Sequence, residues 1–101
     1  MRALALALVL PATLAVTQTI SVSGGDRNNA PYYTFDGVFV APTLVVGTTY
    51  EFVDGGVSGS HPFRITGATG RLPITITVEA GVAPEYYCAK HTSMKATFTI
   101  S

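Results

Sequence analysis

Residues 85–98, EYYCAKHTSMKATF, decide how this chain of 101 residues is organised. They include the only cysteine, Cys88, one of the two histidines, His91, and the only methionine besides Met1, which is Met94. Alternating apolar and aromatic residues flank these three, which predicts two strands joined by a tight turn at the edge of a sheet. The three side chains are therefore expected to lie together on one loop.

A thiolate, an imidazole and a thioether form a soft set of metal ligands. Such ligands select copper over magnesium, calcium or manganese, which prefer oxygen. Zinc would accept the cysteine and the histidine, but its structural sites are closed by four nitrogen and sulfur ligands and it seldom takes a thioether. One cysteine and two histidines in a trigonal plane with a weak axial methionine form the blue-copper arrangement. The loop supplies three of these four ligands, and the fourth must be a histidine from elsewhere.

His61 is the one histidine that remains, in the segment SHPFRIT at 60–66. It stands before an expected short strand, 63–66, and after a glycine-rich turn, 55–59. The predicted metal ligands are therefore His61, Cys88, His91 and Met94, for one copper ion.

The sequence resembles the cupredoxins, small blue-copper electron carriers such as plastocyanin and amicyanin. The resemblance lies in GSHPF at 59–63 and in YCAKHTSM at 87–94. The two residues between His91 and Met94 match the short ligand loop of amicyanin, whereas plastocyanin-like loops are longer. The resemblance implies a Greek-key β-sandwich, a type 1 copper that cycles between Cu(II) and Cu(I), and redox partner proteins. It also implies that His91 lies near the surface and passes electrons through its ring edge.

Two features depart from the family pattern. Only 26 residues, 62–87, separate His61 from Cys88, fewer than in familiar cupredoxins. One connection is therefore expected to be missing, so that the sandwich has a reduced strand count or takes a strand from a partner. Pro62 follows His61 where many relatives have asparagine, and proline has no backbone N–H to donate toward the cysteine sulfur.

Other interpretations of these residues stay open. A lone cysteine is most often a small buried hydrophobic residue, and a methionine can simply fill a gap in a core. The chain is then a structural or adhesive β-sandwich without redox function, or a protein that stores copper. An enzyme is not expected, because a cysteine nucleophile needs a histidine base and an orienting partner, and no acid is assigned to Cys88 and His91.

Composition sets the broad class of the protein. With 48% hydrophobic and 12% charged residues, the chain is expected to fold as one domain, and its formal net charge of zero does not indicate a polybasic face for nucleic acid or membrane lipid. Residues 1–15 resemble a signal peptide: Arg2 precedes an apolar run, and Thr13 to Ala15 provide small residues for cleavage. The run is too short to span a membrane. The mature domain, 16–101, is thus expected to be exported to a periplasm, the extracellular space or an organelle lumen, without a membrane span.

The remaining pattern predicts an all-β chain, a small antiparallel β-sandwich, and the resemblance to the cupredoxins adds the Greek-key topology. Strands are expected at 17–22, 32–35, 38–40, 44–46, 48–53, 63–66, 72–79, 86–88 and 97–100. The expected core consists of the apolar residues on one side of these strands: Tyr50, Phe52, Phe63, Ile65, Ile74, Ile76, Val78, Phe98 and Ile100.

Overall fold

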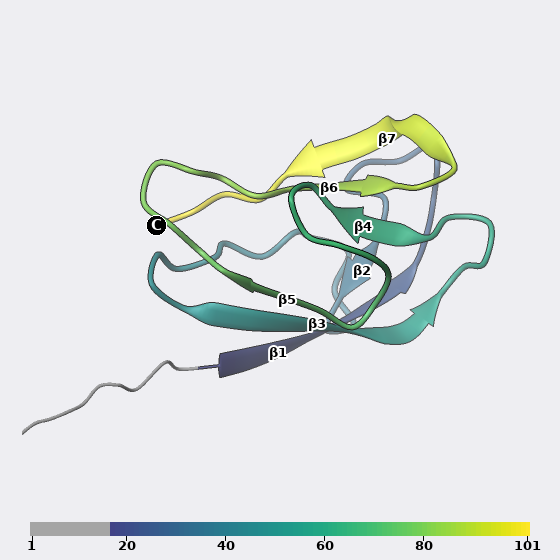
Figure 1. Cartoon of the computed structure of the whole chain (residues 1–101). Helices are drawn as coiled ribbons and strands as arrows, with labels where there is room; N and C mark the ends of the chain where they lie inside the picture. The colour runs from purple at the N-terminus through teal and green to yellow at the C-terminus, as the bar shows by residue number, and fades with distance from the viewer. Residues whose placement is uncertain (1–16) are drawn as a thin grey trace, which may run out of the picture.

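A computed structural model describes residues 17–101 of the chain (Figure 1). These residues form seven strands and no helix, which confirms the all-β prediction. The strands are β1 (Thr17–Gly24), β2 (Thr34–Phe35), β3 (Thr49–Val57), β4 (Phe63–Ile65), β5 (Ile74–Thr77), β6 (Glu85–Cys88) and β7 (His91–Thr97).

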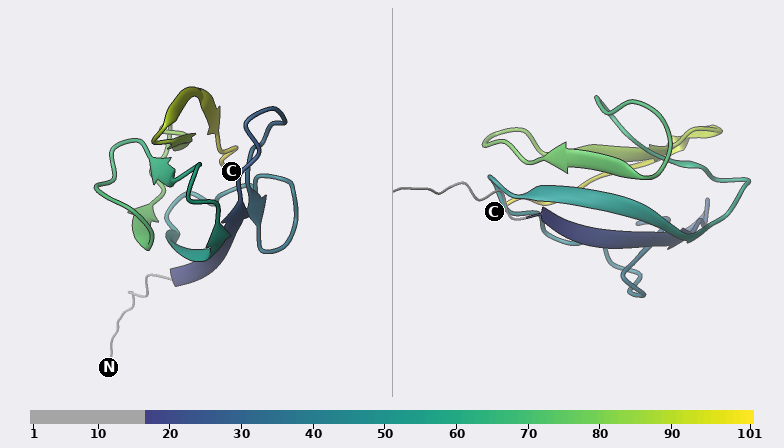
Figure 2. Two further views of the ribbon diagram at one scale, coloured as in Figure 1. Left: turned by 90° about the vertical axis from the view of Figure 1, so that its right-hand side faces the viewer. Right: turned by 60° about the horizontal axis from the view of Figure 1, so that its bottom comes forward.

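The strands build two sheets that pack face to face as a sandwich. One sheet has the order β2-β1-β3-β5 and the other the order β4-β6-β7. Figure 2 shows the second sheet, with the β6–β7 hairpin, lying over the first. The small β-sandwich expected from the sequence is therefore confirmed.

One strand pair departs from the antiparallel expectation: β1 and β3 run parallel, from Thr17 opposite Thr49 to Val22 opposite Asp54. Parallel neighbours need a long crossover between them, and residues 25–48 provide it. The pairing continues past an irregularity to Gly24 opposite Val57, and the N–H of Ser58 donates to the Gly24 carbonyl at 2.8 Å. The loop after β1 is thereby fixed beside the turn that leads to His61.

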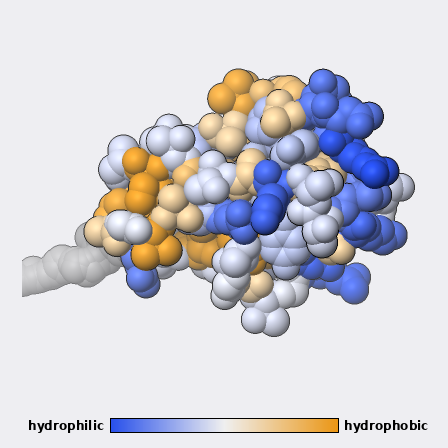
Figure 3. All heavy atoms as spheres, turned by 90° about the horizontal axis from the view of Figure 1, so that it is seen from above, coloured by the Kyte–Doolittle hydropathy of each residue, from blue (hydrophilic) through white to orange (hydrophobic). Residues whose placement is uncertain are grey.

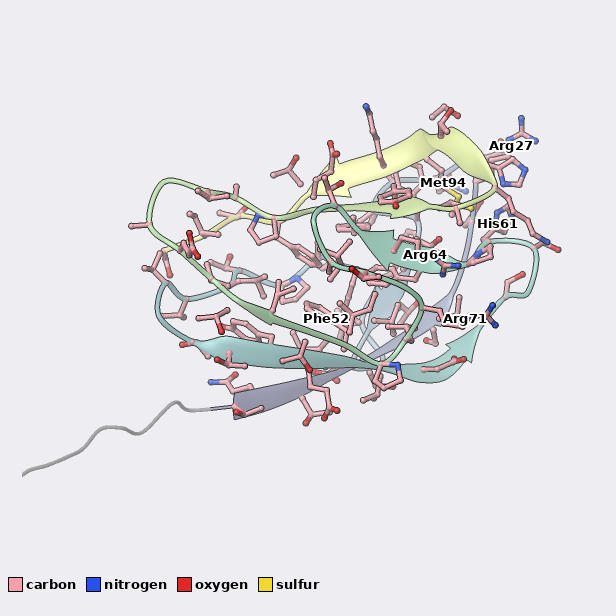
Figure 4. The ribbon with its side chains drawn as sticks, in the orientation of Figure 1. Arg27, Phe52, His61, Arg64, Arg71 and Met94 are labelled. Atoms are coloured by element: carbon pink, nitrogen blue, oxygen red, sulfur yellow. The ribbon has the colours of Figure 1, made fainter. Side chains whose placement is uncertain are left out.

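The core lies between the two sheets and is dominated by aromatic rings. Strand alternation turns Phe52 and Phe63 inward from opposite sheets, with ring centroids 6.0 Å apart. Phe52 is labelled between the sheets in Figure 4. Of the expected core residues, Tyr50, Phe52, Phe63, Ile65, Ile74, Val78 and Phe98 are buried, and Ile76 and Ile100 are partly buried against them.

Three strand predictions are corrected by the structure. Segments 38–40 and 44–46 contribute only single bridges, between Val38 and Phe35 and between Leu44 and Ile100. Pro42 interrupts this stretch, and Val38 and Val40 are more than half exposed, so their apolar alternation has no sheet to pack against. The predicted closing strand at 97–100 lies earlier in the chain, as β7 at His91–Thr97.

The expected signal peptide, 1–15, lies outside the described residues. Within the part of the chain that the structure describes, there is no long apolar helix of the kind that crosses a membrane.

Candidate metal centre

The structure brings together the side chains of His61, Cys88 and His91, although His61 is distant from the other two in sequence. The Nδ1 atoms of the two histidines are 3.2 Å apart. The Cys88 Sγ atom lies 3.8 Å from Nδ1 of His61 and 3.5 Å from Nδ1 of His91. Their potential ligand atoms all lie within 4.8 Å of one another, so the three could bind one metal ion.

The β6–β7 hairpin positions two of the three side chains. Cys88 ends β6, His91 begins β7, and the two residues form a cross-strand pair with only Ala89 and Lys90 between them. Residues directly opposite on neighbouring strands project to the same face of the sheet. The turn is therefore shorter than the sequence predicts, and it holds the thiol and the imidazole side by side.

A bulge in β7 accounts for the position of Met94. Cys88 is paired with His91 and Tyr87 with Lys95, so residues 92–94 have no counterparts on β6. In an unbroken strand, residues three apart point to opposite faces. Because the bulge interrupts the alternation, Met94 returns to the inner side of β7, where it is 0% exposed, as is Cys88. Figure 4 shows Met94 beneath β7, at the same end of the molecule as His61.

His61 is held by its backbone at the entrance to β4. The N–H of His61 donates to the carbonyl of Ser58 at 3.0 Å, which closes the turn after β3. The carbonyl of Pro62 accepts a hydrogen bond from the N–H of Ala89 at 3.0 Å. Pro62 thus has no N–H for the cysteine sulfur, but it connects the His61 segment directly to the hairpin of the other ligands.

The loop between β1 and β2 packs against His61 from a second side, and sequence reasoning missed this contact. A Cβ atom at Gly25 would lie 2.8 Å from the Cβ of His61 and 3.4 Å from its Cγ and Cδ2. The buried Tyr33 hydroxyl donates to the carbonyl of His61 at 2.8 Å. The sequence shows only a turn-forming cluster here, with no spacing motif that connects it to His61.

The electrostatic surroundings favour the neutral form of His91. Desolvation lowers its pKa, and the positive charges of Arg27 and Lys90, together with His61, lower it further. Metal ions bind the unprotonated imidazole, so this shift favours the ligating form. The pKa of Tyr33 is raised, first by burial and then by the neighbouring Cys88, so its hydroxyl keeps its proton and remains a donor.

The spacing of the three atoms fits one metal ion. Bonds of about 2.0–2.1 Å to nitrogen and about 2.3 Å to sulfur, at angles between tetrahedral and trigonal, separate ligands by about 3.4–3.8 Å. The observed separations of 3.2, 3.5 and 3.8 Å agree with this range to about 0.2 Å. The donor set of one thiol, two imidazoles and a buried thioether suits a soft metal.

No protein-family model, curated protein or solved structure matches this chain. The similarity to the cupredoxins therefore consists of the β-sandwich and of a His-Cys-His cluster that is compatible with a cupredoxin-like site.

Proposed function

We propose that this chain binds one copper ion through His61, Cys88 and His91, with Met94 as a weak axial ligand, and that it carries single electrons. The observation that carries the proposal is the convergence of the two Nδ1 atoms and the Sγ atom to within 3.8 Å of one another. The ligand set supports copper, because thiolate and thioether sulfur with two imidazoles is the blue-copper set.

When bound, copper would supply a one-electron couple between Cu(II) and Cu(I). The contribution of the chain is to hold the ligands in place. Cys88 and Met94 are fully buried on paired strands, and the His61 backbone is bonded at its N–H and at its carbonyl. Side chains fixed by core packing and by hydrogen bonds keep one arrangement, which limits the rearrangement that a change of oxidation state would otherwise require.

We further propose that electrons leave and enter through His91. Cys88 is fully buried, whereas His91 is only partly buried and is followed by the exposed residues Thr92 and Ser93. The imidazole therefore connects the buried sulfur to the surface. Tyr87, partly buried and adjacent to Cys88, provides a second route.

We also propose that this electron carrier is exported and has no catalytic activity of its own. Cys88 is the only cysteine and is buried without a disulfide. In an oxidising compartment an unpaired thiol is at risk of oxidation, and ligation to a metal together with burial would protect it.

The test is a titration of the full chain with Cu(II), followed by visible absorption and voltammetry. The expected result is an intense absorption band at about 600 nm that saturates at one copper ion per chain, together with a reversible one-electron wave in voltammetry. Cys88→Ser should abolish the band, whereas Ser93→Ala, an exposed neighbour on the same hairpin, should retain it. A folded chain without the band would contradict the proposal, and tight copper binding without a reversible wave would favour copper storage instead.

A further inference from the structure

A positively charged cleft lies next to the candidate metal centre. It has a volume of about 480 Å³, and its charged lining residues are three cations, Arg64, Arg71 and Lys90, and one carboxylate, Asp54. The cleft also contacts Pro62, which directly follows His61, while Lys90 directly precedes His91. Figure 4 shows Arg64 and Arg71 at the same end of the molecule as His61. Both histidines of the site therefore border this cleft through their neighbours in sequence.

The positive charge is local, because the part of the chain that the structure describes is not basic as a whole. Of the six Lys and Arg residues, Arg2 lies outside residues 17–101, which leaves five against six Asp and Glu residues, a net charge of 5 − 6 = −1. Yet four of those five cations lie at the end of the molecule that holds the candidate metal centre: Arg27, Arg64, Arg71 and Lys90. Figure 3 shows hydrophilic residues gathered at this end and hydrophobic ones at the opposite end.

The acidic residues near this end are engaged in their own turns. The Asp54 Oδ1 atom accepts the N–H groups of Gly56 and Val57, both at 2.9 Å. Asp26 accepts the N–H of Asn28 at 3.0 Å and the side-chain amide of Asn29 at 2.7 Å. Local donors thus hold these two carboxylates in their own turns. They keep their charge, and the cleft lining stays positive because Arg64, Arg71 and Lys90 outnumber Asp54.

The cations keep donors for an external ligand. Arg64 donates from Nη1 to the carbonyl of Phe63 at 3.2 Å, and Lys90 donates from Nζ to the carbonyl of Gly59 at 3.4 Å. A guanidinium has five N–H groups and an ammonium three, so each retains several. The planar fork of an arginine matches the two oxygens of a carboxylate.

We propose that this cationic cleft docks a carboxylate-rich surface of the protein with which the chain exchanges electrons. The identity of that partner as a redox protein rests on the proposed function. A protein surface fits better than a small anion because the charges come from separate segments, namely β4, the β4–β5 connection and the β6–β7 turn, with Arg27 beside His91 as well. Together they flank both histidines, so an acidic partner would be steered toward the site and held over it.

The experiment is a titration of the ¹⁵N-labelled, metal-free full chain with hexaglutamate, followed by NMR, with hexalysine and inorganic phosphate as comparison ligands. Hexaglutamate should produce saturable shifts in amides at 58–61, 63–64, 71–72 and 89–91, and the dissociation constant should rise with salt. Arg71→Gln and Lys90→Gln should each weaken binding about two- to fivefold, the range for exposed ion pairs. Lys95→Gln removes the same charge from an exposed position farther along β7 and should leave binding unchanged.

Three results would overturn the proposal: equal weakening by Lys95→Gln, shifts confined to other surfaces, or phosphate binding at the same amides more tightly than hexaglutamate. The last would indicate a site for a small anion. Because this titration uses no metal, its failure is distinct from a failure of copper binding. In the copper-loaded chain, Arg71→Gln should leave the visible spectrum unchanged, which would show that Arg71 takes no part in copper ligation.

Discussion

Replacing Gly25 by alanine is the sharpest test of how the fold positions His61. The two residues are far apart in sequence, and they meet only because β1 and β3 pair in parallel and Ser58 is bonded to Gly24. Gly25 has a φ of +140°, a backbone angle that residues other than glycine rarely adopt. The substitution therefore has two separable effects: backbone strain and displacement of a proposed metal ligand.

The size of the displacement follows from the contact distances. The new methyl carbon would lie 2.8 Å from the Cβ of His61, whereas carbon atoms pack at about 3.5–4.0 Å. One of the two segments must then move by about 0.7 Å or more. Metal–ligand distances tolerate only about 0.2 Å, and loss of a supporting contact typically lowers metal affinity about 10- to 100-fold. We expect Gly25→Ala to weaken copper binding by that factor, and the strained φ to lower the free energy of unfolding by about 1–3 kcal/mol.

The assay is competition for copper against a chelator of known affinity, with denaturant unfolding of the metal-free chain measured in parallel. Gly47→Ala is the matched control, because Gly47 also has a positive φ, +88°, but a Cβ atom added there would meet no atom within 4 Å. This variant should lose stability to strain and keep its copper affinity. Unchanged affinity in Gly25→Ala, or an equal loss in Gly47→Ala, would refute the argument that Gly25 positions His61.

Three further changes test separate parts of the structure. Tyr33→Phe leaves the partly buried His61 carbonyl without its 2.8 Å donor and should cost about 1–3 kcal/mol in denaturant unfolding, whereas no loss would show that water replaces the hydroxyl. Asp54→Asn should lower stability near neutral pH, since N–H bonds from Val57 and Gly56 lower the pKa of Asp54 below 3.8. The folded carboxylate binds protons less readily than the unfolded one, so the difference should shrink as the pH falls through this lowered pKa; a constant difference in unfolding free energy across pH 2–7 would contradict it. Met94→Leu keeps the core volume and should cost less than about 1.5 kcal/mol, yet it should shift the copper reduction potential, and an unchanged potential would exclude Met94 as an axial ligand.

The sequence predicts the strands of the sandwich from short-range alternation, and it predicts the candidate ligands from spacing and composition. Alternation identifies the inward residues of β3, such as Tyr50 and Phe52, and their burial confirms the prediction. Cys88 and His91 lie close in sequence, and His61 is the only other histidine, so composition alone limits the choice. The structure then brings these three side chains together.

What the sequence does not predict depends on long-range pairing. The parallel registration of β1 with β3 leaves no local signal, and the contact of Gly25 with His61 follows from it. The bulge at 92–94 is equally hidden, because its residues have no distinctive composition, and its consequence is that Met94 lies on a strand and not in the turn. At 38–40 and 44–46, apolar alternation resembles that of strands, but the neighbouring strands offer only single bridges there.

Copper-edge X-ray absorption of the copper-loaded full chain tests the central claim most directly, because it reports which atoms bind the ion. The account predicts a close shell of one sulfur and two imidazole nitrogens, from Cys88, His61 and His91, with the sulfur lost in Cys88→Ser and one nitrogen lost in His61→Ala. A shell of oxygen and nitrogen alone, or one that is unchanged by these substitutions, would contradict it.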